Sequence, residues 1–325
     1  MRIGIIGAGA IGGAMAALLA KAGHEVEVTA RGAHLESIAA DGIRLTGAWG
    51  TSVAKVAASE RLSDRKDLVI VTTKAQDAAT AMADNASALE GTLVLIVQNG
   101  LDGMTTAREA APSATVVGGL AMFAASYLSP GEVTITTAAP TYLGGDAADR
   151  VAAILAPVMP VEVVANFAGA QWTKLFINQV NALPAITGLT VQEVIAEHRL
   201  RRILTASMRE TVITGLAARV RFASLQTLSH DRLVLFAALP LLLGQWIPLR
   251  MAARMGNVPN PGSTLQSIRR GQPTEIDYLN GAVVAQAAVI GRTAPINSDI
   301  TALVHEVEAS GAFIPIAEVV RRVRR

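Results

Sequence analysis

The chain has 325 residues, of which 51% are hydrophobic and 17% are charged, so it is long enough for two domains and too apolar to be disordered. A net charge of +2 is too balanced to indicate nucleic-acid binding, and the absence of cysteine excludes disulfides, thiolate metal sites and a cysteine nucleophile. We expect no metal site. The start MRIGII is typical of a strand and not of a signal peptide, which predicts a cytoplasmic protein.

The first 31 residues carry the clearest pattern in the chain. An apolar run at residues 3–6 predicts a strand, and a G-x-G-x-x-G motif then precedes an alanine-rich segment that predicts a helix. In such a unit Gly7 allows a tight turn, Gly9 lets the backbone approach a pyrophosphate, and Gly12 lets the helix pack closely on the strand. The first-turn N–H groups of the helix then face the phosphates. We therefore predict a dinucleotide-binding loop made of Gly7, Ala8, Gly9, Ala10, Ile11 and Gly12.

The end of the second predicted strand, residues 25–29, indicates which dinucleotide is bound. A protein that binds NAD usually carries Asp or Glu there, about 20 residues beyond the glycines, whereas this chain has Thr29, Ala30 and Arg31. A guanidinium complements a 2′-phosphate through charge-assisted hydrogen bonds, and a carboxylate would repel it. We predict NADP(H) as the cofactor, with Arg31 as the selector and His34 as a candidate neighbour. The alternative is that Arg31 is only a solvated charge.

Two continuous apolar runs, residues 67–72 and 92–97, predict parallel strands that are buried on both faces. Lys74 follows the first run and Asn99 follows the second. Ligands of open parallel sheets bind beyond the carboxyl ends of the strands, so Lys74 and Asn99 are expected near the nicotinamide half of the cofactor and the substrate. Without that context, each would be an ordinary surface loop residue.

From residue 116 onward, short strands with turn signals suggest antiparallel additions that complete the first domain. A helix at 147–155 and a strand at 161–164 would follow, and the later sequence has helical period. The predicted fold class is α/β, with a Rossmann-type dinucleotide-binding domain followed by an all-α C-terminal domain. The predicted boundaries are 1–168 for the NADP-binding domain and 169–325 for the domain that binds substrate and dimerises.

The first helix of the second domain is expected near Ala170, and it places Lys174, Asn178 and Asn181 at i, i+4 and i+7 on one face. Such a face either caps a neighbour or lines a binding site. Only five of the 28 basic residues are lysines, and none follows Lys174. A desolvated lysine can release a proton near neutral pH and arginine cannot, so Lys74 and Lys174 are candidate proton carriers. GC-rich coding alone would also favour arginine.

The remaining sequence predicts helices with one informative break. Residues 233–249 form the candidate membrane span, but 17 residues with two prolines favour a buried or interface helix. A helix at 263–270 ends at Gly-Gln-Pro, after which Thr274 can cap a new helix that has Glu275 in its first turn. The break allows Ser263 and Glu275 to approach one site, although they could also be only a cap and a partner of the helix dipole. Residues 294–297 are expected to open the last helix.

These motifs together resemble the ketopantoate reductase family over nearly the whole chain. They are GAGAIG with Arg31, TTKAQD, QNGLDG, SPGEV, QWTKLFIN and GSTLQSIRRGQPTEIDYLNG. The resemblance implies NADPH-dependent reduction of 2-dehydropantoate, a 2-oxo acid, to pantoate in pantothenate synthesis. It matches Lys174 to the general acid and Glu275 to the partner of the substrate hydroxyl. The residues that would hold the substrate are Asn99, Asn178, Asn181, Ser263 and Glu275.

Two features depart from the family pattern. One is an insertion around residues 233–256, which exceeds the length of the compact members. The other is residue 182. Ala182 stands where the family helix commonly carries a second asparagine, and Asn181 precedes it, in a pattern N-x-x-N-A that we interpret as a longer-chain subgroup. These departures concern the part of the chain that is expected to bind the substrate, so reduction of another 2-oxo acid or an imine stays open as an alternative. A non-enzymatic NADP(H) sensor is a further alternative, although a sensor has no need of a proton donor. The apolar second domain is consistent with a homodimer.

Overall fold

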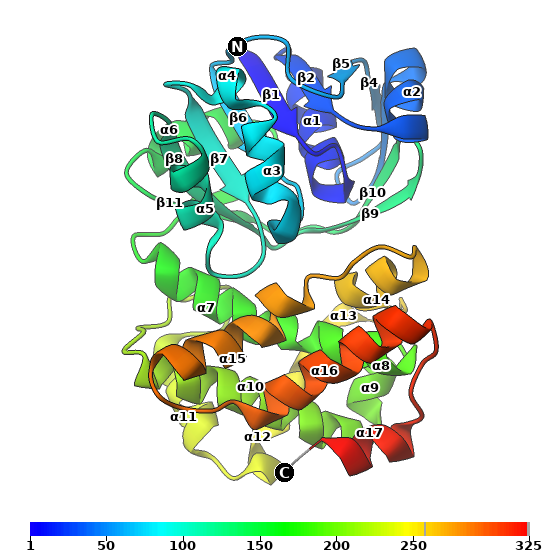
Figure 1. The fold of residues 1–325 in the computed structure, drawn as a ribbon, viewed down its shortest axis with the longest axis vertical. Helices are drawn as coiled ribbons and strands as arrows, with labels where there is room; N and C mark the ends of the chain where they lie inside the picture. Colours follow the sequence, from blue (N-terminus) through cyan, green and yellow to red (C-terminus); the bar gives the residue numbers. More distant parts are fainter. Residues whose placement is uncertain (257, 324–325) are drawn as a thin grey trace. The chain divides into compact units, whose positions relative to one another are not determined.

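The chain folds into an α/β unit, Met1–Phe167, followed by a helical unit, Ala168–Arg325 (Figure 1). The computed structural model describes residues 1–256 and 258–323. All described helices of the second unit lie after residue 166, and all described strands lie before it. This architecture confirms the predicted fold class, a Rossmann-type α/β domain before an all-α domain.

An eight-stranded sheet forms the centre of the first unit, in the order β12-β11-β8-β7-β6-β1-β2-β5. Its strands are β1 (Arg2–Ile6), β2 (Glu25–Thr29), β5 (Ala57–Ser59), β6 (Leu68–Val71), β7 (Leu93–Val97), β8 (Thr115–Ala121), β11 (Thr141–Gly144) and β12 (Val161–Val163). The six strands from β8 to β5 pair in parallel, whereas β11 pairs antiparallel with β8 and β12 pairs in parallel with β11. The expectation that every strand after residue 116 is antiparallel is therefore wrong for β8, whose valines continue the buried parallel sheet.

Both faces of this sheet are buried because successive side chains of each strand point to opposite faces. Ile5 of β1 packs in one core cluster with Met15, and Ile6 packs in the other with Leu89. Six helices accompany the strands of this unit. They are α1 (Ala10–Lys21), α2 (Gly32–Asp41), α3 (Ala78–Ala83), α4 (Ala86–Leu89), α5 (Gly103–Ala110) and α6 (Ala148–Leu155).

A second sheet of four strands, in the order β4-β3-β10-β9, lies against α1 in the same unit. Its strands are β3 (Ile43–Gly47), β4 (Ser52–Ala54), β9 (Ala124–Ser129) and β10 (Glu132–Thr137). The parallel pair β3 and β10 joins segments 88 residues apart, for example Thr46 and Thr134, whose hydroxyls are 2.6 Å apart. Short strands were expected after residue 116, but not a second sheet that pairs them with β3.

The helical unit contains α7 to α17 and two 3-10 turns. Its elements are α7 (Phe167–Asn178), η2 (Gln179–Asn181), α8 (Ala182–Thr187), α9 (Val191–Ala196), α10 (His198–Ala217), α11 (His230–Ala238), α12 (Leu241–Gly244), α13 (Trp246–Met255), α14 (Gly262–Arg269), η3 (Ile276–Tyr278), α15 (Asn280–Val289), α16 (Pro295–Ser310) and α17 (Ile316–Arg322). The apolar segment 233–249 is not one helix, because it is divided among α11, α12 and α13. Across residues 1–256 and 258–323, the structure has no helix long and apolar enough to cross a membrane.

One sequence-based expectation about the C-terminus needs correction. The helix that opens at Pro295 is not the last, because α17 follows it. Arg322 lies in α17, and its guanidinium is 2.5 Å from a carboxylate oxygen of Glu306. Arg324 and Arg325 lie outside the described residues.

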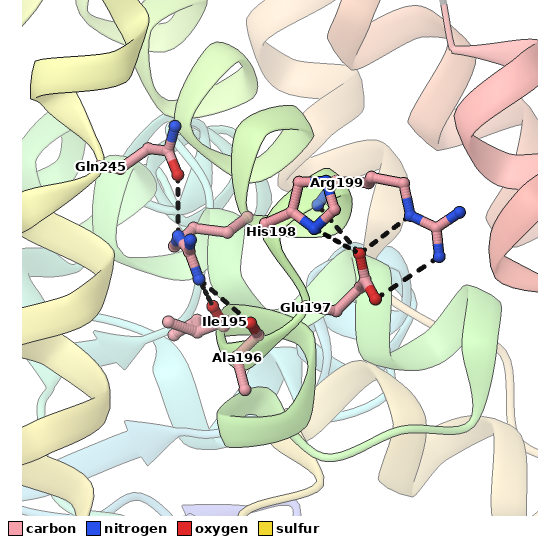
Figure 2. A network of polar contacts seen from close by, with 7 residues as sticks. Ile195, Ala196, Glu197, His198, Arg199 and Gln245 are labelled. Atoms are coloured by element: carbon pink, nitrogen blue, oxygen red, sulfur yellow. Dashed lines mark hydrogen bonds and ion pairs between the residues drawn. The ribbon is translucent and has the colours of Figure 1, made fainter.

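A network of polar contacts fixes the corner where α9 ends and α10 begins (Figure 2). The Glu197 carboxylate caps α10 by accepting from the Arg199 backbone N–H at 3.1 Å and from its Nε at 2.9 Å. These hydrogen bonds lower the pKa of the Glu197 carboxyl to about 2. Arg201 donates to the Ile195 carbonyl at 2.6 Å and to Gln245 Oε1 at 2.8 Å, so one guanidinium holds the end of α9 and the start of α13.

A second polar network is wholly buried and joins α10, α15, α16 and η2. Ser207 donates to Gln179 Oε1 at 2.8 Å, and Asn280 Nδ2 donates to Gln179 Oε1 at 2.7 Å and to Asn297 Oδ1 at 2.9 Å. All four side chains are at most 1% exposed. Buried polar groups need their partners, so these contacts fix the relative positions of the helices that carry them. They anchor the turn that directly follows α7.

Candidate active site

The glycine loop after β1 has the geometry that its three glycines permit. Gly7 has φ of +98°, which favours glycine, and an added Cβ there would lie 2.9 Å from Thr73 Cγ2. A Cβ on Gly12 would lie 2.1 Å from the Gly7 carbonyl oxygen, so only glycine lets α1 start this close to the strand. Gly9 is the N-cap of α1.

The loop is open at Gly9. A Cβ added there would meet no atom within 4 Å, and α1 has no side-chain hydrogen bond at its N-cap. The loop is otherwise anchored to β2, because Thr29 accepts from the Ala8 N–H at 2.9 Å and from the Gly7 N–H at 3.0 Å. An open backbone at the start of a 12-residue helix fits the pyrophosphate of a dinucleotide.

Arg31 directly follows β2 and is the N-cap of α2. Its side chain is 78% exposed, and its Nη2 is 3.8 Å from Asp84 Oδ2. Asp84 also accepts from Arg61 Nη2 at 3.2 Å, so two guanidinium groups share one carboxylate. The structure thus places Arg31 at the end of β2, on the surface and near a second cation.

Glu27 is the one carboxylate near the end of β2 that is buried, with 8% exposure, and it pairs within the unit. Its Oε2 is 2.6 Å from Lys66 Nζ and 2.8 Å from Ser63 Oγ. Burial alone would raise the pKa of the Glu27 carboxyl, but hydrogen bonds from Lys66 and Ser63 lower it below its ordinary value. Glu27 therefore stabilises the fold of this unit through its contacts with Lys66 and Ser63.

Lys74 and Asn99 follow the carboxyl ends of β6 and β7, as expected. A residue that the sequence analysis did not single out connects these two ends. Gln98 is 8% exposed, and its Nε2 donates to the Thr73 carbonyl at 2.9 Å and to the Lys74 carbonyl at 3.4 Å. An amide directly after a buried strand was the only sequence signal for this role. Gln98 holds the two loops in a fixed relation.

Lys174 lies in α7 and is 8% exposed. Burial lowers the pKa of the Lys174 ammonium to about 8, and the nearby charge of Glu275 partly opposes this fall. A lysine with a pKa near 8 exists in both protonation states around neutral pH, so it can donate a proton to a reacting group.

Glu275 is close enough to act on Lys174, but it does not begin an α-helix as the sequence predicted. It is the N-cap of the 3-10 turn η3, and α15 begins only at Asn280. Thr274 Oγ1 accepts from the Ile276 N–H at 3.2 Å, which is a short turn rather than a helix cap. The expectation that the dipole of an α-helix acts on Glu275 is therefore wrong.

The three polar residues predicted for one helix face are also divided. Asn178 is the last residue of α7, whereas Asn181 lies in the 3-10 turn η2, which changes the helical period. Asn181 instead lies against α14. A Cβ on Gly262, which has φ of +71°, would lie 2.7 Å from Asn181 Oδ1. Asn181 is thus adjacent to the residue that precedes Ser263, which lies exposed in the first turn of α14.

His305, which the sequence analysis missed, joins α16 to the segment around Glu275. Its Nε2 is 2.9 Å from Asp277 Oδ1 and its Nδ1 is 2.7 Å from Glu308 Oε2, while Glu308 Oε1 accepts from the Thr274 N–H at 2.7 Å. Burial lowers the pKa of His305, but the hydrogen bonds to both carboxylates raise it above its ordinary value overall. His305 and Asp277 are 28 residues apart, so no local pattern could indicate this contact.

Comparison with known proteins agrees with this arrangement in both units. The family described as Ketopantoate reductase PanE/ApbA matches residues 3–147, and its C-terminal family, Ketopantoate reductase PanE/ApbA C terminal, matches residues 166–308. A 2-dehydropantoate 2-reductase from Pyrococcus horikoshii is 26% identical and aligns over 96% of this chain and 99% of its own.

Solved structures show the same fold. The crystal structure of a PanE/ApbA family ketopantoate reductase from Ralstonia eutropha is 30% identical, with a TM-score of 0.83 over 95% of this chain and 99% of its own. D-mandelate dehydrogenase, in a ternary structure with NADH and anilino(oxo)acetate, is 22% identical, with a TM-score of 0.82 over 95% of this chain and 99% of its own. The second likeness concerns the fold alone. On the matches to both halves of the sequence, this chain belongs to the ketopantoate reductase family.

Proposed function

We propose that this protein reduces 2-dehydropantoate (ketopantoate) to pantoate with NADPH. The observation that carries the proposal is Lys174, a buried lysine whose pKa is lowered to about 8 near the carboxylate of Glu275. In a chain that belongs to this family, a proton donor tuned in this way supports reduction of the ketone of a 2-oxo acid.

The cofactor assignment rests on residues of the first unit. The loop Gly7 to Gly12 would bind the pyrophosphate, which the open backbone at Gly9 supports. Arg31 would bind the 2′-phosphate, and the absence of a carboxylate at residues 29–31 supports NADPH over NADH. Lys74 and Asn99 would contact the nicotinamide half. When bound, the reduced dinucleotide supplies the hydride for the ketone carbon.

In the proposed reaction, Lys174 donates a proton from Nζ to the substrate oxygen as negative charge develops there. The charge of Glu275 favours the protonated form of Lys174, so that the ammonium is present before the reaction. Glu275 would also accept a hydrogen bond from the substrate hydroxyl. Asn178, Asn181, Ser263 and Asn99 would hold the remaining polar groups of the substrate.

The second candidate is reduction of another 2-oxo acid or an imine. It is favoured by Ala182, which is 1% exposed and apolar at the position where the family commonly carries an asparagine. Asn181 and Gly262, which lie together, would then define a different polar surface for the substrate.

The experiment that tests the proposal measures NADPH oxidation with ketopantoate, with a panel of other 2-oxo acids and with imines, and repeats each with NADH. We expect fast turnover that is selective for ketopantoate and for NADPH. Turnover of a different keto acid or imine would favour the second candidate. NADPH binding without turnover of any carbonyl compound would favour a sensor.

Three further expectations about the protein stay predictions. We expect a homodimer formed through the helical unit, a cytoplasmic location, and a division of labour in which residues 1–168 bind cofactor and 169–325 bind substrate. Light scattering of the purified protein measures the oligomeric state directly, and a monomeric mass would contradict the first of these.

A further inference from the structure

His34 lies in α2 and connects two backbone segments that are distant in sequence. Its Nε2 is 2.7 Å from the carbonyl oxygen of Ala8, in the glycine loop, and its Nδ1 accepts from the Gly131 N–H at 3.0 Å, in the turn between β9 and β10. The sequence analysis named His34 as a candidate neighbour of the 2′-phosphate. Both of its ring nitrogens have backbone partners instead.

These partners determine the protonation state of the ring. A backbone N–H can only donate, so Nδ1 must carry a lone pair towards Gly131, and a carbonyl can only accept, so Nε2 must carry the hydrogen towards Ala8. His34 is therefore the neutral Nε2–H tautomer. A protonated ring would have two donors and would lose the bond from Gly131.

The ring has one further contact, and α2 has a second contact with the same turn. The ring makes an edge-to-face contact with Tyr127 at a centroid distance of 4.7 Å. One turn later on the same helix, Ser37 Oγ donates to the Pro130 carbonyl at 3.0 Å, and a Cβ on Gly131 would lie 2.5 Å from Ser37 Oγ. The turn at residues 129–131 is thus built against α2, the helix that has Arg31 as its N-cap.

The bond to Ala8 bears on the glycine loop through one peptide plane. The Ala8 carbonyl and the Gly9 N–H belong to the same peptide unit, which is trans and planar, so they point in opposite directions. Gly9 can adopt backbone angles that other residues cannot, so its own sterics restrict rotation of this peptide less than any other residue would. The hydrogen bond from His34 fixes the carbonyl and thereby the direction of the Gly9 N–H.

We propose that His34 is a positioning residue for the dinucleotide, which orients the Ala8–Gly9 peptide towards the bound pyrophosphate and holds this loop to α2. The inference rests on the proposed function in that it takes the glycine loop as the cofactor site. It assigns His34 no contact with the cofactor. Because the pyrophosphate is common to both dinucleotides, His34 acts on NADPH and NADH alike, whereas Arg31 distinguishes between them.

The test measures binding of NADPH and of NADH by calorimetry, without any keto acid, to the wild type and to three variants. We expect His34→Ala to lower the affinity for both dinucleotides by about 3- to 10-fold, which corresponds to the loss of one hydrogen bond. The ratio of the NADPH affinity to the NADH affinity should stay unchanged. His34→Gln, whose amide can still donate to the Ala8 carbonyl, should recover most of the affinity. Ser37→Ala is the matched control, because it removes the other bond from α2 to the same turn without touching the loop, and it should bind within about twofold of wild type.

The same variants are then compared in thermal melting and, at saturating cofactor, in turnover. Turnover of His34→Ala should stay near wild type, since His34 does not touch the reacting atoms. Equal loss of affinity in Ser37→Ala and His34→Ala would overturn the inference, as would unchanged affinity in His34→Ala. If His34→Ala does not fold, a folded His34→Gln that binds both dinucleotides more than about tenfold more weakly than the wild type would also overturn it. A wild type that binds neither dinucleotide would contradict the proposed function rather than the role of His34.

Discussion

The two units of this chain hold their functional groups in opposite ways. In the first unit the important positions are glycines, and the geometry depends on side chains that are missing: a Cβ on Gly12 would lie 2.1 Å from a carbonyl oxygen. In the second unit the important positions are side chains that are present and buried, and Lys174 is only 8% exposed. We therefore expect added side-chain atoms to disrupt the glycine loop of the first unit, and the removal of side-chain atoms to disrupt the site of the second unit.

The variant with the largest expected effect is Lys174→Ala, in the second unit. Loss of a positioned proton donor should lower turnover by about 100- to 10,000-fold, while the affinity for NADPH changes little. Lys174→Arg is the matched control, because it keeps the charge but cannot release a proton near neutral pH, so its turnover should be as low. Single-turnover rates with ketopantoate measure this. Wild-type turnover in either variant would remove Lys174 as the general acid.

Two glycine substitutions in the first unit separate fold from binding. Gly12→Ala should lower the melting temperature, because the added methyl group overlaps backbone and Thr72 Oγ1, which would lie 2.3 Å from it. Gly9→Ala should leave melting unchanged, because its Cβ points into open space, yet weaken NADPH by roughly tenfold or more if that space holds the pyrophosphate. Calorimetry and thermal melting distinguish the two. Full NADPH affinity in Gly9→Ala would show that the ligand does not approach there.

Arg31→Ala tests selection between the cofactors. We expect it to weaken NADPH by about tenfold and NADH by less than twofold, because only NADPH has a phosphate for the guanidinium. Asp84→Asn is the opposite control, since it removes the carboxylate that Arg31 and Arg61 share and should leave NADPH binding equal or slightly tighter. Equal losses for both dinucleotides in Arg31→Ala would remove it as the selector.

The smallest expected effect is a shift in the pH profile. Lys174 must be protonated to donate, so the rate should fall about tenfold per pH unit above pH 8, where its pKa lies. Glu275 raises that pKa, so Glu275→Gln should move the falling limb to lower pH as well as weaken substrate binding. Steady-state kcat/KM between pH 6 and 10 measures the limb. A limb that stays in place would mean that Glu275 does not act on Lys174.

The sequence predicted the first unit better than the second because its signals are local. The strand, the three glycines and the helix of the loop are contiguous, and β1, β2, β6 and β7 were expected close to their observed bounds. The direction of a strand depends on its partners in the sheet, so the sequence wrongly predicted that β8 is an antiparallel addition. The pairing of β3 with β10 was missed for the same reason.

In the second unit the residue types were informative and the geometry was not. Scarcity of lysine indicated Lys174, but helical spacing could not reveal that a 3-10 turn moves Asn181 out of line with it or that Glu275 precedes a second 3-10 turn. His305 of this unit, like Gln98 of the first unit, acts through contacts with a segment far away in the chain. Such contacts follow from packing, which a single sequence does not display.

The late pairing of β3 has a consequence for biosynthesis. β3 is made soon after α2, but its parallel partner β10 begins only at Glu132, and the N–H that donates to His34 Nδ1 belongs to Gly131. A nascent chain that has not reached residue 131 therefore carries β3 and β4 as an open-edged hairpin and a His34 ring that lacks its bond from Gly131. Contacts of such long sequence separation form late in folding. The ability to bind a dinucleotide should thus be acquired in one step, after nearly the whole first unit has left the ribosome.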